Sequence, residues 1–247
     1  MSRTGRTGEG RGRLGSVLSG VAVALGCVLF LGGFVWGAIA YQPYSVPSDS
    51  MSPTIKNGDR VLAQRIDGGE VRRGDVVVFR EPSWGNGDLP MVKRVVGIGG
   101  DTVACCDAGG RLTVNGKAVE EPYLRPGSEA SATGGIPPTT VPKGRLFVLG
   151  DERANSMDSS ARLQQAMKGS VARSAVDARV DAVAWPMDGL LERPSGFEEL
   201  GAVSSPGPLR LVFGAAVAGA VLILGGAAYG PVAGFFGRRR EVHSRAR

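Results

Sequence analysis

The sequence predicts a mainly β domain flanked by two transmembrane α-helices, and three observations support this fold class. Two long runs, residues 16–40 and 211–237, contain no charged residue across 25 and 27 positions. Either run exceeds the roughly 20 residues that cross a bilayer core. Arginines border both runs at the chain ends, as the positive-inside rule expects of cytoplasmic ends. Between the runs, short β-branched segments alternate with turn residues, which is typical of strands.

The two apolar runs divide the chain into six segments. They are a cytoplasmic basic tail (1–15), transmembrane helix 1 (16–40), an extracytoplasmic domain (41–193), a linker (194–207), transmembrane helix 2 (208–237) and a second cytoplasmic basic tail (238–247). An alternative for the first run is a cleavable secretory signal that ends at Ala38-Ile39-Ala40, but 25 apolar positions are too many for a signal core. The alternative for the second run is a buried hairpin. We therefore expect a multi-pass protein of the cell membrane.

The net charge of +6 comes from the tails and not from the middle of the chain. Residues 41–210 contain 20 Lys or Arg against 21 Asp or Glu. A near-neutral domain lacks the basic surface that nucleic-acid binding requires, so we expect no nucleic-acid partner. The bilayer is the expected partner of the basic tails.

Histidine and cysteine chemistry is largely excluded. The single histidine, His243, follows the second apolar run, so the middle domain cannot contain a Ser-His-Asp triad, a Cys-His pair or an HExxH zinc site. Three cysteines do not make a disulfide framework, and their spacing does not suggest zinc. We interpret the adjacent Cys105 and Cys106 as structural or incidental, and no metal or organic cofactor is implied.

Six apolar, β-branched runs are the predicted strands of the middle domain. They are residues 60–63, 75–79, 92–96, 102–104, 146–149 and 179–185. Asn115-Gly116 predicts a type I′ hairpin within residues 111–119. Residues 128–142, rich in Gly, Pro, Ser and Thr, predict an exposed loop, and residues 159–168 predict a short helix.

A hydrolase without histidine needs another base, and a neutral lysine amine can accept a serine proton. An apolar site must then lower the lysine pKa, because burial disfavours the charged form. Of the five lysines in the domain, Lys93 alone lies in an apolar, strand-like run. The alternative is a strand lysine that faces solvent, which periodicity alone favours.

Four segments then occur in an order that resembles the type I signal peptidases. Residues 47–54 (PSDSMSPT), 92–97 (VKRVVG) and 150–159 (GDERANSMDS) resemble three signatures of that family. Residues 73–79 (RGDVVVF) resemble the structural box between them. The resemblance covers most of residues 41–188 and implies a signal-peptidase-like β-sheet catalytic domain. Some actinobacterial members of the family resemble this chain in having a C-terminal span.

The resemblance implies a role for each matching residue. Ser50 corresponds to the nucleophile, Lys93 to its general base, Ser48 to the hydroxyl of the oxyanion hole and Ser156 to the serine that orients the lysine amine. Asp158, Arg94, Asp151 and Arg153 correspond to the charged set that holds the site together. The apolar wall that selects small side chains would involve Val46, Met51, Ile55 and Val92.

The sequence departs from the family pattern at several positions. Gly99 replaces a usual proline, and Glu152 replaces a residue that is commonly Asn or His. Ser160 occupies the position of an expected arginine, and Arg162 follows two places later. These departures put an ion pair between Asp158 and an arginine in question.

The function that the resemblance implies is a membrane-bound serine endopeptidase that removes signal peptides from exported preproteins. It would cleave after A-x-A-type sites, with small residues at −1 and −3, through an acyl-enzyme. The alternatives are a catalytically decayed membrane protein of the same fold and a Ser-Lys autoprotease of the SOS-repressor type. We also expect Tyr41, Tyr44 and Trp84 to anchor the catalytic face at the lipid headgroups, with ordinary packing of these rings as the alternative.

Overall fold

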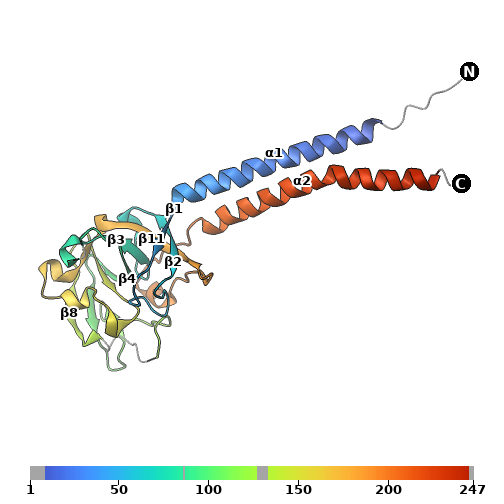
Figure 1. Cartoon of the computed structure of the whole chain (residues 1–247). Coiled ribbons are helices and arrows are strands. Elements are labelled where there is room, and N and C mark those ends of the chain that lie inside the picture. Colours follow the sequence, from blue (N-terminus) through green and yellow to red (C-terminus); the bar gives the residue numbers. More distant parts are fainter. Residues whose placement is uncertain (1–8, 86, 127–132, 245–247) are drawn as a thin grey trace, which may run out of the picture. The chain divides into compact units, whose positions relative to one another are not determined.

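The structure is a computed structural model that describes residues 9–85, 87–126 and 133–244. The chain divides into two compact units. One unit combines Met1–Ile39 with Pro208–Arg247, and the other is Ala40–Gly207. The second unit consists of β-strands, and the first contains two long helices (Figure 1). The predicted fold class, a mainly β domain with two long apolar helices, is confirmed.

An eight-stranded antiparallel sheet forms the larger part of the β unit. Its order is β1-β2-β11-β3-β4-β9-β10, and β12 pairs with β11. The bounds are β1 Tyr41–Ser45, β2 Arg60–Arg65, β3 Val76–Phe79, β4 Met91–Ile98, β9 Arg145–Leu149, β10 Val171–Ala172, β11 Val176–Trp185 and β12 Gly189–Leu190. Five of the six predicted strands belong to this sheet. Strand β4, which contains Lys93, lies between β3 and β9.

A four-stranded sheet, in the order β7-β6-β5-β8, forms the rest of the β unit. Its strands are β5 Thr102–Cys105, β6 Leu112–Val114, β7 Lys117–Ala118 and β8 Ile136–Thr140. The predicted hairpin is confirmed, and both turn residues have the positive φ of a type I′ turn, 55° at Asn115 and 77° at Gly116.

Two local predictions in the β unit were wrong. Strand β8 lies within the predicted loop 128–142, of which 128–132 fall outside the described residues. The two prolines of β8 are compatible with a strand because β8 is at the sheet edge, where a missing N–H breaks no ladder. In place of the predicted helix 159–168, there are two short 3-10 helices, Ser160–Arg162 and Ala166–Gly169. The structure joins Cys105 to Cys106 by a disulfide.

The two long helices, α1 Glu9–Ala40 and α2 Leu209–Ser244, contain segments apolar enough to cross a membrane, Gly15–Ala40 and Leu209–Tyr229. The second run is therefore one helix and not a hairpin. The helices lie side by side and approach closely at glycines. A Cβ on Gly26 would lie 2.8 Å from the carbonyl oxygen of Gly219. Ser19 Oγ donates a hydrogen bond of 2.6 Å to the Gly226 carbonyl, as is common between helices in membranes.

The β unit begins and ends at one buried polar cluster. Tyr41, the first residue of β1, donates from its hydroxyl to Asp181 Oδ2 at 3.0 Å. Gly207 lies against the same pair, because a Cβ there would be 2.7 Å from the Tyr41 hydroxyl and closer still to Asp181. Nearby in the linker, Ser204 Oγ donates to buried Asp75 Oδ2 at 2.7 Å. Residues 194–207 are therefore a fixed part of this unit.

Candidate active site

Ser50 and Lys93 form the centre of the candidate site. Ser50 lies in the turn that follows β1, and Lys93 lies in β4. Lys93 Nζ donates a hydrogen bond of 2.5 Å to Ser50 Oγ, within the reach that proton transfer requires. The structure thus brings together two residues that are 43 positions apart in the sequence.

Lys93 is only 6% exposed, although periodicity alone favoured a solvent-facing lysine. Residues 93–97 are all buried because β4 is covered on both faces, so alternation along the strand does not identify an exposed side. Burial lowers the pKa of Lys93 to about 8, against the opposing effect of Asp158 and Asp151. At pH 7.5 a pKa of 8 leaves roughly a quarter of the amine neutral, compared with about one molecule in a thousand for an ordinary lysine.

Ser48 and Ser156 flank this pair in different ways. Ser48 Oγ lies 3.3 Å from Ser50 Oγ, with either hydroxyl able to donate. Ser156 Oγ is buried and has no hydrogen-bond partner among the described residues. The structure therefore places Ser48 beside Ser50, whereas the expected contact from Ser156 to the lysine amine is absent among these residues.

A groove of about 310 Å³ contains Ser50 and Lys93. Of the predicted wall residues, Val46 and Val92 line it. The other two, Met51 and Ile55, are 0% exposed and pack in the core behind it, so their place in the wall stays a prediction. The lining residues that sequence reasoning missed include Tyr44, Pro90, Met91, Asn155 and Met157. Tyr44, Pro90 and Met91 lie just before signature segments, and Asn155 and Met157 lie within one. This proximity in sequence was the available signal.

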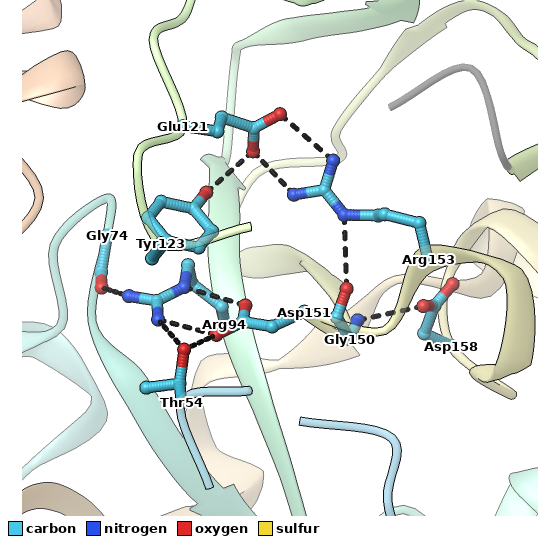
Figure 2. A network of polar contacts seen from close by, with 9 residues as sticks. All are labelled: Thr54, Gly74, Arg94, Glu121, Tyr123, Gly150, Asp151, Arg153 and Asp158. Atoms are coloured by element: carbon cyan, nitrogen blue, oxygen red, sulfur yellow. Dashed lines mark hydrogen bonds and ion pairs between the residues drawn. The ribbon is translucent and has the colours of Figure 1, made fainter. Parts of the chain in front are cut away.

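A buried ion pair fixes the strand that carries Lys93. Arg94 binds Asp151 through two hydrogen bonds, from Nε to Oδ1 at 2.8 Å and from Nη2 to Oδ2 at 2.6 Å. Thr54 Oγ1 donates to the same Oδ2 at 2.5 Å, which connects the segment that contains Ser50 to this pair (Figure 2). The Arg94 guanidinium also stacks on the Tyr123 ring, 3.8 Å from its centroid. A bidentate pair of this kind fixes the orientation of the two side chains as well as stabilising their contact.

A second ion pair holds the loop after β9. Arg153 donates from Nη1 to Glu121 Oε2 at 2.9 Å and from Nε to the Gly150 carbonyl at 3.0 Å. The Tyr123 hydroxyl donates to Glu121 Oε1 at 2.6 Å (Figure 2). Glu121 and Tyr123 were not among the predicted site residues, and no motif in the sequence distinguishes them. The four predicted charged residues therefore lie in one network with partners from outside the signatures.

Asp158 is held by neutral donors. Its Oδ2 accepts from the backbone N–H of Gly150 at 2.8 Å, and its Oδ1 accepts from Ser160 N at 3.0 Å and Ser160 Oγ at 2.7 Å. Within the described chain, no lysine or arginine forms an ion pair with it. Ser160 therefore binds the carboxylate from the position at which an arginine was expected.

This arrangement has the parts of a serine hydrolase whose base is a lysine: a hydroxyl in contact with a buried, partly neutral amine, beside an open groove. A model of the signal peptidase family, peptidase S26, matches residues 16–185. The chain therefore belongs to this family of serine endopeptidases, which remove signal peptides from preproteins.

Individual relatives agree with that membership. The chain is 31% identical over 234 residues to a signal peptidase I of Mycobacterium tuberculosis, and this match covers 75% of this chain and 78% of that protein. It is 40% identical over 130 residues to signal peptidase I T of Bacillus subtilis, covering 48% and 63% respectively. A crystal structure of a signal peptidase I from Enterococcus faecalis is 27% identical, with a TM-score of 0.31 over 49% of this chain and 96% of that one. The two apolar helices and these relatives indicate association with a membrane.

Proposed function

We propose that the chain removes signal peptides from exported preproteins after A-x-A-type sites, with Ser50 as nucleophile and Lys93 as general base. The observation that carries this assignment is the 2.5 Å contact between Lys93 Nζ and Ser50 Oγ, both of which line the groove. It is supported by the buried position of the amine, which keeps a useful fraction neutral.

The reaction proceeds in two halves. Neutral Lys93 takes the proton of Ser50 while Ser50 Oγ attacks the scissile carbonyl, and the resulting ammonium gives that proton to the leaving amine as the C–N bond breaks. Water then attacks the acyl-enzyme carbonyl while Lys93 accepts its proton, and the ester C–O bond breaks as the ammonium returns that proton to Ser50 Oγ. The signal peptide leaves with a new carboxyl group, which ionises in water. The backbone N–H of Ser50 and the Ser48 hydroxyl stabilise the oxyanion in both halves.

The groove supplies the specificity in this proposal. Val46 and Val92 present aliphatic surface beside Ser50, and the core behind them is closed by Met51 and Ile55. A large −1 side chain that extended toward Met51 and Ile55 would have to displace packed core atoms, which costs free energy. An alanine methyl group would not. Small residues at −1 and −3 are therefore preferred.

The test of this function is a cleavage assay with the full-length enzyme in detergent and a preprotein that has Ala at −1 and −3. We expect a single cut after the −1 alanine, established by sequencing the new N-terminus. Changing the −1 residue to Leu should reduce cleavage at least about tenfold, whereas Leu at +2 serves as the matched control and should have little effect. Cleavage that is indifferent to the −1 residue would contradict the assignment.

We further propose that both termini lie in the cytoplasm and the β unit lies outside. Arginines adjoin each span at the chain ends, and the β unit is near neutral. Ser50 follows Ala40 by ten residues, so even a fully extended link spans only about 35 Å and keeps the site near the bilayer. The six segments defined from the sequence keep their boundaries in this proposal.

The residues expected to anchor the unit at the headgroups need correction. Tyr41 and Trp84 are buried, 4% and 7% exposed, because one binds Asp181 and the other packs edge-to-face on Phe79. Tyr44 is half-buried and lines the groove. The exposed large apolar side chains of the β unit include Trp185 and Met187, at 65% and 87%. We propose that these two contact the bilayer.

Protease added to intact spheroplasts tests the orientation. We expect external protease to cut the β unit and to spare an epitope placed after Arg247, because the membrane shields the cytoplasmic side. Permeabilised cells are the control, in which the epitope should be lost. Loss of the epitope in intact cells would refute the two-span topology.

A further inference from the structure

Arg162 is a buried cation with few direct partners. It is 8% exposed, and its guanidinium carbon lies 4.4 Å from the centre of the Trp84 ring. Two long hydrogen bonds of 3.4 Å run from Nη1 to the Asp158 carbonyl and from Nη2 to the Trp84 carbonyl. Its Nε has no partner among the described residues. A guanidinium has five N–H donors, so hydrogen bonding compensates little of the cost of burying this charge.

The charge that compensates Arg162 is the carboxylate of Asp158, four residues earlier. This carboxylate is 0% exposed and accepts only from the neutral donors Gly150 and Ser160 within the described structure. Asp158 raises the pKa of Arg162 against the lowering effect of burial. The two residues therefore form a buried, oppositely charged couple that is not in direct ion-pair contact.

Both members of this couple act electrostatically on Lys93. Asp158 and Asp151 raise the pKa of Lys93, and Arg162 lowers it. Asp151 is already bound on both oxygens by Arg94. Asp158 has no such cation in contact, so its field favours the protonated form of Lys93 against the effect of burial, unless another charge opposes that field. Among the described residues, Arg162 is the cation in position to do so.

We propose that Arg162 is a positioning residue of the active site: held on the Trp84 ring, it offsets the charge of Asp158 and thereby keeps the Lys93 amine available as a base. Arg162 supplies the positive charge that an arginine at position 160 would have supplied, from a position two residues further along the chain. Arg162 does not contact Ser50 or the groove. This inference rests on the proposed function, because it takes Lys93 as the general base.

The fixed position of Arg162 supports this role. The Trp84 ring packs against Phe79 at a centroid distance of 5.5 Å and an interplanar angle of 87°. Phe79 lies in β3, opposite Met91 of β4, two residues before Lys93. The Arg162 guanidinium is thus stacked on Trp84, which belongs to the same core cluster as residues of β4, the strand that contains Lys93. The distance between the charges of Arg162 and Lys93 is therefore set by core packing and not by a mobile side chain.

The experiment measures the pH dependence of kcat/KM for the full-length enzyme in detergent, because this profile reports the pKa of the free enzyme's base. Arg162→Met removes the charge and keeps an apolar stem on Trp84. We expect its acid limb to move to higher pH by about half a unit or more, with most of the rate recovered on the alkaline plateau. Arg162→Lys keeps the charge and should keep the wild-type limb.

Arg80→Gln is the matched control, because it removes one arginine from a half-exposed pair with Asp177 on the same sheet. Its limb should not move. An unmoved limb in Arg162→Met, or an equal loss at every pH, would overturn the proposal. Failure of both Arg162→Met and Arg162→Gln to fold would also overturn it, since the Trp84–Phe79 packing should suffice for folding. A folded, active Lys93→Arg enzyme would instead refute the proposed function itself, whatever Arg162 does.

Discussion

Ser50→Ala is expected to lower kcat/KM for preprotein cleavage by at least about a thousandfold, the largest effect of any single change in this chain. Without Oγ no acyl-enzyme forms, and the groove and oxyanion donors alone supply only a small part of a serine enzyme's rate. The measurement is single-turnover cleavage of an A-x-A preprotein in detergent.

Ser83→Ala is the control for Ser50→Ala, since Ser83 is exposed and bonds only to Glu81 nearby. It should cleave at the wild-type rate. A folded Ser50→Ala enzyme that retained cleavage would mean that another group is the nucleophile. Equal inactivity of the wild type would indicate the decayed membrane protein that the sequence left open.

Lys93→Arg is expected to cost at least about a hundredfold in activity while the protein stays folded. Arginine keeps the positive charge and nearly the same length, but its pKa above 12 prevents it from accepting the Ser50 proton. No histidine exists in the β unit to replace it. Activity of the wild type should rise with pH through about 8, because the neutral amine is the active form and burial lowers the pKa of Lys93 to that value.

Lys117→Arg provides the comparison for Lys93→Arg, because Lys117 is an exposed lysine, also on a β-strand. It should leave both the rate and the pH profile unchanged. Thermal unfolding of both variants checks that they are folded. Near-normal cleavage by Lys93→Arg would exclude lysine as the base.

Most strands could be predicted because the local pattern and the tertiary environment agree. The β-branched runs of β3 and β9 are buried and central, and the Asn115-Gly116 turn has one favoured conformation. Strand β8 could not be predicted, because its pairing with β5 outweighs the two prolines that locally favour a loop. The segment 159–168 is not one helix either, because Met167 and Lys168 have φ values of 55° and 53°, outside the right-handed helical region.

The residues of the candidate site that lie in the signature segments could be predicted from the order of those segments along the chain. The contacts that depend on how side chains pack in the fold could not. Ser50 and Lys93 lie within signature segments, and the structure brings them together. That Met51 and Ile55 turn into the core, while Met157 lines the groove, depends on which way a loop closes. The stacking of Arg162 on Trp84 joins residues 78 positions apart, and nothing in either segment indicates it.

The close contact between α1 and α2 has a thermodynamic consequence for the β unit. While the helices remain paired through Gly26 and Gly219, the roughly 170 residues between them form a closed loop even when they are unfolded. Closing a loop of that size removes chain entropy worth about 5 kcal/mol from the unfolded state, the amount that the loop-closure model gives for a disulfide. The helix pair thus acts on the β unit as a non-covalent cross-link as well as an anchor. A bilayer that keeps the two helices together stabilises the folded β unit without direct contact between the two.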